Sequence, residues 1–211
     1  MKLLIFGGTG LTGQKVIEKA ISKNHQVVAY MRSPQKLDPV LASKITVIEG
    51  ELDDQENIMH ALDGVDAVLS TLGPTSAPSK GLPITHGYQT IVTCMERKGI
   101  RRIIALGTPS YKDQEYDGTS WIATLAIGSI KWMMHDAYLE MNGIGNALQA
   151  SHLDWTLARV YFLTNGNEGT VKSGYVGETG FFISRSDLAQ FFINELEQNE
   201  FVLKAPVIYA A

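Results

Sequence analysis

The sequence predicts an α/β protein with a doubly wound, mostly parallel sheet and helices on both faces. Short apolar and β-branched runs alternate along the 211 residues with segments of helical spacing. The strand-like runs are almost continuously apolar, which is typical of parallel strands that are covered on both faces. A glycine-rich turn joins the first strand to the first helix. We therefore expect one domain over residues 1–211, with excursions at 107–130 and 163–181.

The predicted elements follow in order along the chain. Strands are expected at 2–6, 26–31, 45–49, 65–70, 101–106, 154–160 and 205–209. Apolar residues at three- and four-residue intervals predict helices at 11–21, 58–62, 91–98, 130–148 and 188–196. Asp53 or Asp54 is expected to cap the second helix, Gly99 to end the third, and Ser186-Asp187 to cap the fifth. The stretch 107–125 reads as a loop.

Composition narrows the function classes. Lys and Arg number 18 against 22 Asp and Glu, a net charge of −4, which disfavours a general nucleic-acid binder. The one cysteine, Cys94, excludes an internal disulfide and is expected to be a buried small side chain. The histidines His25, His60, His86 and His152 lack ligand spacing, so we expect no metal.

Neither a secretory signal nor a membrane span is expected. The apolar start, Met1–Phe6, is too short for a signal peptide and reads as a strand. The longest apolar stretch, Trp121–Met134, is interrupted by Gly128, Ser129 and Lys131 and is too short to cross a bilayer. We expect a soluble cytoplasmic protein with no membrane partner.

The glycine turn is the strongest motif. Gly7, Gly10 and Gly13 follow the first strand and open the first helix, at G-x-x-G-x-x-G spacing. The first glycine permits the tight turn, the second lets a pyrophosphate approach, and the third allows close packing. The helix N-terminus then offers unpaired N–H groups to phosphate. This is the Rossmann dinucleotide pattern, so we assign to the cofactor Gly7, Thr9, Gly10, Leu11, Thr12 and Gly13.

The end of the second strand indicates NADP rather than NAD. An NAD site usually carries an acidic residue there for the ribose 2′-hydroxyl. This chain has none and carries Arg32, with Ser33 and Lys36 close behind, which suit a 2′-phosphate. The alternative is that Arg32 and Lys36 are ordinary solvated surface charges.

Other strand ends supply further cofactor candidates, because the carboxyl ends of parallel strands meet at one edge. Glu51 and Leu52 are expected beside the adenine. The remaining candidates would contact the ribose, the diphosphate or the nicotinamide: Thr71, Leu72, Gly73, Thr108, Tyr161 and Phe162.

Several segments resemble one family. The chain is similar to atypical short-chain dehydrogenases/reductases of the NmrA-like and biliverdin reductase B (flavin reductase)-like kind. The resemblance rests on Gly7–Gly13, Ala61–Val68, Arg101–Ala105, Ala150–Arg159 and Ile183–Ala189. It implies a Rossmann-type sheet, NADP or NAD binding, and either reductase activity or cofactor sensing without turnover.

The usual catalytic pair of the wider superfamily is missing. No tyrosine in the chain has a lysine four residues later; after Tyr138 the position holds Asn142. Thr108 and Ser110 follow the fifth strand and could orient a substrate carbonyl, or simply cap the loop. His135 could donate a proton, although an exposed histidine without a chemical role is the competing interpretation.

The residues favour an NADPH-dependent reductase. A flat conjugated acceptor such as a flavin, quinone or tetrapyrrole needs alignment more than a tyrosine–lysine pair. Trp121, Trp132, Met133 and Met134 are expected to be mainly core, with an acceptor pocket or a self-association surface, as in a homodimer, as alternatives. The second hypothesis is a non-catalytic NADP-sensing protein, and a third, sugar-nucleotide epimerase or dehydratase, is disfavoured by the short C-terminal part.

Overall fold

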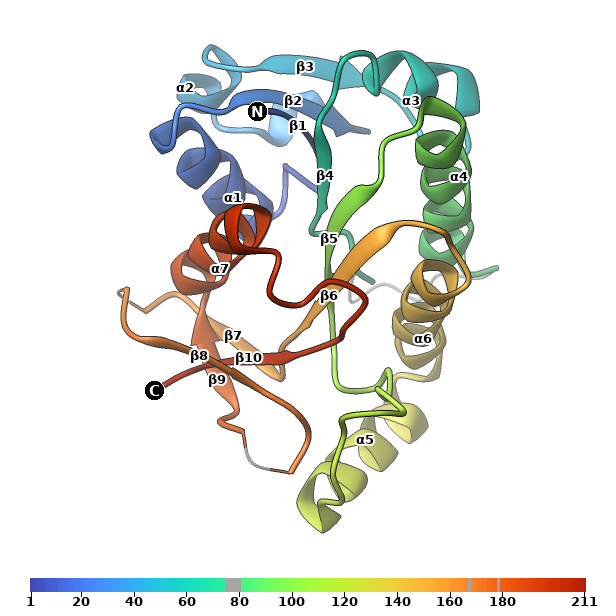
Figure 1. The fold of residues 1–211 in the computed structure, drawn as a ribbon, viewed down its shortest axis with the longest axis vertical. Coiled ribbons are helices and arrows are strands. Elements are labelled where there is room, and N and C mark those ends of the chain that lie inside the picture. Colours follow the sequence, from blue (N-terminus) through green and yellow to red (C-terminus); the bar gives the residue numbers. More distant parts are fainter. Residues whose placement is uncertain (75–80, 167, 178) are drawn as a thin grey trace.

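A computed structural model describes residues 1–74, 81–166, 168–177 and 179–211, without the side chains of 122, 123, 126 and 130. In this part of the chain the central sheet has eight strands, in the order β3-β2-β1-β4-β5-β6-β10-β8 (Figure 1). All neighbours are parallel except β8 and β10. The strands are β1 Lys2–Phe6, β2 Gln26–Met31, β3 Thr46–Glu49, β4 Ala67–Ser70, β5 Arg102–Gly107, β6 Asp154–Arg159, β8 Val171–Gly174 and β10 Val207–Ala210. The predicted fold class is confirmed.

Helices cover both faces of this sheet (Figure 1). One core cluster joins Leu3 and Ile5 of β1 to α1, α2 and α7, and the other joins Leu4 and Phe6 to α3, α4 and α6. Alternate side chains of one strand therefore feed two cores, which explains why the strand is apolar throughout. The helices are α1 Leu11–Ser22, α2 Pro39–Ala42, α3 Gln55–Ala61, α4 Pro83–Lys98, α6 His135–Gln149 and α7 Arg185–Gln198, with a short 3₁₀ turn, η1, at Pro34–Lys36.

Strand β1 lies at the point where the winding reverses. It pairs with β2 on one side and β4 on the other, both in parallel. The loops that follow these strands diverge toward opposite faces and leave a crevice at their carboxyl ends, where ligands bind in open α/β sheets. The strand order thus brings the glycine turn, the end of β2 and the end of β4 to one edge.

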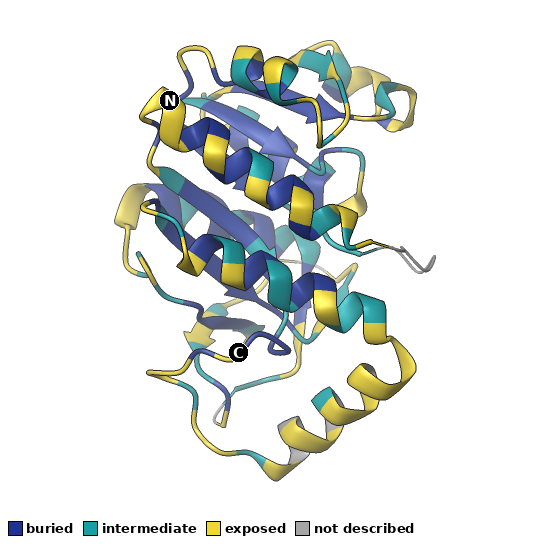
Figure 2. Cartoon of the chain, turned by 90° about the vertical axis from the view of Figure 1, so that its right-hand side faces the viewer, coloured by how far each residue is buried: buried dark blue, intermediate teal, exposed yellow. Residues whose placement is uncertain are grey.

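The region 107–148 differs from its prediction. The expected helix 130–148 is two helices, α5 Trp121–Met133 and α6, separated at Met134, and α5 begins inside the expected loop 107–125. The side chain of Ile130 lies outside the described residues. Helix α5 stands off the sheet (Figure 2). The expectation of core is wrong for Trp121, Trp132 and Met133 of this helix and for Met134 after it, which are 75%, 83%, 72% and 50% exposed. No helix in the described part of the chain is long and apolar enough to cross a bilayer.

The glycine-rich excursion after β6 also has more structure than expected. It contributes β8 to the sheet edge, and β7 Phe162–Thr164 pairs in parallel with β9 Phe182–Ser184. The cap of α7 is Ser184 rather than Ser186-Asp187: the Ser184 hydroxyl accepts from the Asp187 N–H at 3.0 Å. Helix α7 therefore begins at Arg185, three residues earlier than the predicted start at 188. Asp54 does cap α3, accepting from the Asn57 N–H at 3.0 Å, and Cys94 is buried, as expected.

A buried ion pair ties both excursions to the sheet. Arg159, at the end of β6, donates to Asp117 Oδ2 and Oδ1 at 2.6 and 2.7 Å, and both side chains are almost fully buried. Arg159 also donates to the Tyr111 carbonyl, while Asp117 Oδ1 accepts from the Val176 N–H at 3.0 Å. One carboxylate therefore holds the end of β6, the 107–120 loop and the loop after β8 together.

Replacing Asp117 with asparagine should lower the free energy of unfolding by about 3–5 kcal/mol, because it leaves the Arg159 guanidinium buried without its counter-charge. Urea unfolding at pH 7, followed by circular dichroism, measures the change. The matched control is Asp154→Asn, which removes the surface pair with Arg101 and should cost less than about 1 kcal/mol. Equal losses in the two variants would contradict the structural role.

The same pair predicts a dependence on pH. Burial raises the pKa of Asp117, but the Arg159 guanidinium and the Val176 and Asp113 N–H groups outweigh it and hold the pKa below the ordinary aspartate value. Such a carboxylate stabilises the fold above its unfolded-state pKa, and the contribution is lost as pH falls through the lower folded-state pKa. The stability gap between wild type and Asp117→Asn should be largest near neutral pH and shrink below about pH 4.

Candidate functional site

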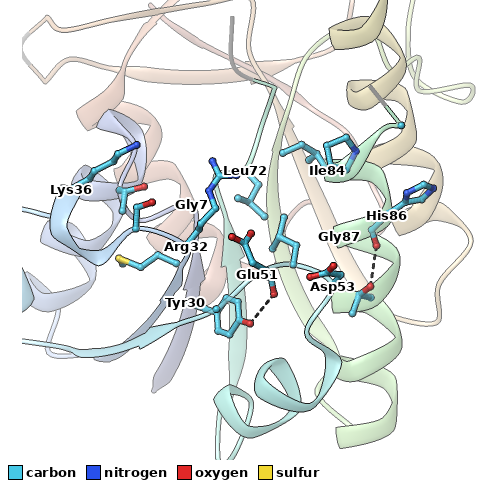
Figure 3. A pocket seen from close by; sticks show the side chains of 18 residues that line it. Gly7, Tyr30, Arg32, Lys36, Glu51, Asp53, Leu72, Ile84, His86 and Gly87 are labelled. Atoms are coloured by element: carbon cyan, nitrogen blue, oxygen red, sulfur yellow. Dashed lines mark hydrogen bonds between the residues drawn. The ribbon is translucent and has the colours of Figure 1, made fainter. Parts of the chain in front are cut away.

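A cavity of about 520 Å³ opens at the carboxyl edge beside the switch point (Figure 3). Its walls come from the glycine turn, the ends of β2, β3 and β4, and the first two turns of α4. Eight of the residues assigned to the cofactor from sequence line it: Gly7, Thr9, Arg32, Ser33, Lys36, Glu51, Leu52 and Leu72. Four separate strand ends thus supply one concave site.

The glycine turn has the geometry its spacing predicts. Gly7 has φ +80°, in the left-handed region, and a Cβ there would lie 2.7 Å from Thr71 Oγ1 and 2.9 Å from the Leu72 nitrogen. A Cβ on Gly13 would overlap the Gly7 carbonyl. The hydroxyl of Thr71, directly after β4, donates to that carbonyl at 3.2 Å and so holds the turn against the end of β4. Larger side chains at either glycine would push the turn away from α1 and β4.

Helix α1 points an uncapped N-terminus at this edge. Its N-cap, Gly10, gives no side-chain hydrogen bond, and the first turn holds no acidic residue. The amides of Leu11, Thr12 and Gly13 have no partner within the helix. An N-terminus of this kind attracts anions through its free N–H groups and its dipole. The residues present therefore fit a dinucleotide's diphosphate.

Two cations line the cavity just after β2. Arg32 follows β2 and Lys36 ends η1, and both are exposed cavity-lining residues (Figure 3). Within the described residues neither side chain is in an ion pair. Ser33 lies between them. Two unpaired cations and a hydroxyl form a donor set that suits a phosphate monoester.

The floor of the cavity includes residues that the sequence reasoning missed. The Tyr30 hydroxyl donates to the Glu51 carbonyl at 2.8 Å and fixes the loop after β3 (Figure 3). Burial, followed by the nearby Asp54 charge, raises the pKa of Tyr30 to about 12, so the hydroxyl keeps its proton at neutral pH. A Cβ on Gly50 would overlap this hydroxyl. The signals available in the sequence were a tyrosine near the end of one strand, β2, and a glycine directly after the neighbouring strand, β3.

The N-terminal part of α4 forms a second missed wall, which brings Pro83, Ile84, His86, Gly87 and Thr90 to the cavity. Proline at a helix start and a glycine inside the helix were the signals in the sequence. The Gly87 position lies against Leu52, where a Cβ would be 2.7 Å from the leucine Cδ1.

The remaining predicted residues lie outside this cavity's lining, which omits Gly10, Leu11, Thr12, Gly13, Thr71, Gly73, Thr108, Tyr161 and Phe162. Thr108 Oγ1 is buried and has no hydrogen-bond partner within the described residues, and Ser110 is buried two residues later. Tyr161 packs against Phe181, with ring centroids 5.0 Å apart, and Phe162 against Phe182 at 5.5 Å. His135 is exposed at the first turn of α6.

Comparisons with solved structures show the shared fold. A short-chain dehydrogenase/reductase from Veillonella parvula DSM 2008 in complex with NADP matches with a TM-score of 0.79 at 17% identity, over 99% of this chain and 94% of that chain. The anaerobillin reductase ChuY from Escherichia coli O157:H7 matches with a TM-score of 0.74 at 22% identity, over 99% and 97%.

Curated relatives match over shorter stretches. The 2-alkyl-3-oxoalkanoate reductase of Stenotrophomonas maltophilia (strain K279a) is 31% identical over 114 residues, which are 52% of this chain and 34% of that protein. The photosystem II assembly factor Ycf39 of Synechocystis sp. (strain ATCC 27184 / PCC 6803 / Kazusa) is 27% identical over 106 residues, 49% and 32%. The chain matches about a third of the length of these relatives.

The sequence model of one protein family, described as NAD(P)H-binding, matches residues 7–199 of this chain. This range includes the glycine turn and every wall of the cavity. The uncapped start of α1 suits such a ligand, as do Arg32 and Lys36, which form no ion pair within the described residues. The chain belongs to the NAD(P)H-binding family, as its resemblance to atypical short-chain dehydrogenases/reductases predicts.

Proposed function

We propose that the protein is an NADPH-dependent oxidoreductase that passes a hydride to a flat conjugated acceptor of the flavin, quinone or tetrapyrrole type. The observation that carries the cofactor choice is the pair of cavity-lining cations, Arg32 and Lys36, which form no ion pair in the described part of the chain. No carboxylate stands at the end of β2, where an NAD site would place one.

The roles of the cavity residues follow from charge and position. The first-turn amides of α1 would bind the diphosphate, and Arg32, Ser33 and Lys36 the 2′-phosphate. The loop at Glu51 and Leu52 would flank the adenosine. The other end of the dinucleotide would then reach the ends of β5 and β6, where Thr108, Tyr161 and Phe162 are located. The Thr108 hydroxyl, which has no hydrogen-bond partner within the described residues, would form a hydrogen bond there with the nicotinamide or the acceptor.

The acceptor side would be built by the two excursions, 107–130 and 163–181. The Asp117 carboxylate joins them, and the rings of Tyr116 and Tyr175 stack across the same junction at 4.9 Å. Exposed aromatic side chains lie in or beside these excursions, including Trp121, Phe162 and Phe181. Such a surface suits a flat conjugated ring system better than a sugar or a small hydroxy acid.

For this hydride transfer, the main task of the protein is to align the nicotinamide with the acceptor. Bound NADPH would supply the hydride, which reduces the acceptor as the nicotinamide is oxidised, and water would supply the proton. A delocalised acceptor disperses the added charge over its rings, so holding the two rings face to face provides most of the rate. Thr108 and Ser110 would orient the acceptor, and exposed His135 would be the alternative to water as proton donor. The reductase names among the relatives support this reaction class.

The cofactor preference is tested by Arg32→Ala. The variant should raise the Kd of NADPH about ten- to a hundredfold, because one charge-assisted contact with the 2′-phosphate is lost. The Kd of NADH should change by less than about twofold, since NADH lacks that phosphate. Titration calorimetry with both cofactors measures the two values.

The control is Arg97→Ala, which removes an exposed arginine from the last turn of α4, at the opposite end from the cavity. It should change neither Kd. Equal weakening of NADPH and NADH in Arg32→Ala would show that Arg32 does not distinguish the two cofactors.

The reaction is tested by following NADPH consumption at 340 nm with FMN, menadione or biliverdin as the acceptor. We expect acceptor-dependent consumption by at least one, in proportion to enzyme concentration and lost in Arg32→Ala at low NADPH. Tight NADPH binding without consumption by any of the three would instead support a non-catalytic NADP-sensing protein.

A further inference from the structure

Helix α4 is capped by a side chain from another helix. Its own N-cap, Leu82, has φ +52° and supplies no side-chain hydrogen bond, and its first turn holds no acidic residue. Instead, Glu140 of α6 accepts from the Ile84 N–H at 3.0 Å and from the Thr85 N–H and hydroxyl at 2.7 and 2.6 Å. Glu140 is fully buried and has no cationic partner in the described part of the chain.

The two helices approach unusually closely at this point. A Cβ on Gly143, one turn after Glu140, would overlap the Thr85 hydroxyl. Helices α4 and α6 lie next to one another on the same face of the sheet (Figure 1). The close approach allows a side chain as short as glutamate to reach the first amides of its neighbour. The cap therefore depends on tertiary packing, and the sequence around Pro83 contains no residue that would predict it.

This cap is adjacent to the cavity. Ile84, whose amide Glu140 accepts from, lines the cavity, as do Pro83 and His86 on either side of the capped residues. Two helix N-termini thus face the same edge: that of α1 has no side-chain cap, and that of α4 is capped by the Glu140 carboxyl group. A carboxylate on the first amides occupies their donors and offsets the positive end of the helix dipole.

We propose that Glu140 is a positioning residue that determines which way the cofactor lies in the cavity. It holds the α4 wall in place and removes that wall's attraction for phosphate, so that the diphosphate goes to α1 and an uncharged part of the nucleotide meets α4. The inference rests on the proposed binding of NADPH in this cavity. Beyond that binding, the inference assigns a role to Glu140 on α6, which would contact neither the phosphates nor the riboses of the cofactor.

The charge of Glu140 is tested with Glu140→Gln, which keeps the size of the side chain and removes its charge. The Kd of NADPH should rise about tenfold, because the α4 wall shifts and competes for phosphate. Inorganic pyrophosphate, titrated alone by calorimetry, should bind about three- to tenfold tighter, since a second N-terminus becomes attractive to anions. A purely structural cap would not tighten pyrophosphate binding.

The matched control is Glu195→Gln. Glu195 is a similarly buried helical carboxylate, but its partners, Arg102, Thr156 and the Glu200 and Phe201 N–H groups, lie outside the cavity lining. The control should lower stability in urea and leave both affinities unchanged. If Glu140→Gln does the same, the inference is wrong.

A second variant keeps the test decisive if Glu140→Gln does not fold. Glu140→Asp retains the charge on a shorter side chain, so it should weaken NADPH binding without tightening pyrophosphate binding. Tighter pyrophosphate binding by this variant would contradict the role of the charge. Failure of wild type to bind NADPH would overturn the proposed function instead, whereas normal wild-type binding with unchanged affinities in the Glu140 variants would overturn only this inference.

Discussion

The contact between Gly13 and the Gly7 carbonyl is the constraint on which the site depends. No side chain fits between the first turn of α1 and the turn that follows β1, because even one added carbon would overlap the Gly7 oxygen. This contact fixes the direction in which α1 leaves the sheet, and therefore where its open amides point. The Thr71 hydroxyl bonds to the same carbonyl from β4, so the first and fourth strands are registered at the point where the cavity begins.

Charge is arranged around that turn in a consistent way. The places where phosphates would bind carry the first-turn amides of α1 and, after β2, Arg32 and Lys36, neither of which forms an ion pair within the described residues. The two buried carboxylates that fix the surroundings have their oxygens already occupied, Asp117 by Arg159 and backbone N–H groups, and Glu140 by the start of α4. Burial makes each of them costly to leave unpaired, which is why each can hold a loop or a helix in a single position. Within the described residues, the two framework carboxylates have hydrogen-bond partners, whereas Arg32 and Lys36 form no ion pair.

Much of the fold could be predicted from local pattern. Continuous apolar runs identified all seven predicted strands, and the glycine spacing located the start of α1, because both signals are confined to neighbouring residues. The exposed apolar helix α5 could not be predicted, since an apolar run such as Trp121–Met134 ordinarily indicates burial, and only the three-dimensional structure shows that it stands off the sheet. Strands β7 and β9 are three residues each, too short to give a pattern. In the site, the role of Arg32 could be predicted because it directly follows a strand. The α4 wall and its cap could not, because the Glu140 contacts with Ile84 and Thr85 join residues that are 56 and 55 positions apart in the sequence.

A crystal structure of the protein with NADPH tests the central claim most directly, because it shows where each phosphate lies. We expect the diphosphate against the amides of Leu11 to Gly13, the 2′-phosphate within hydrogen-bonding distance of Arg32, and the nicotinamide beside Thr108 at the end of β5. A diphosphate at the start of α4, or a 2′-phosphate in solvent with Arg32 turned away, would contradict the account.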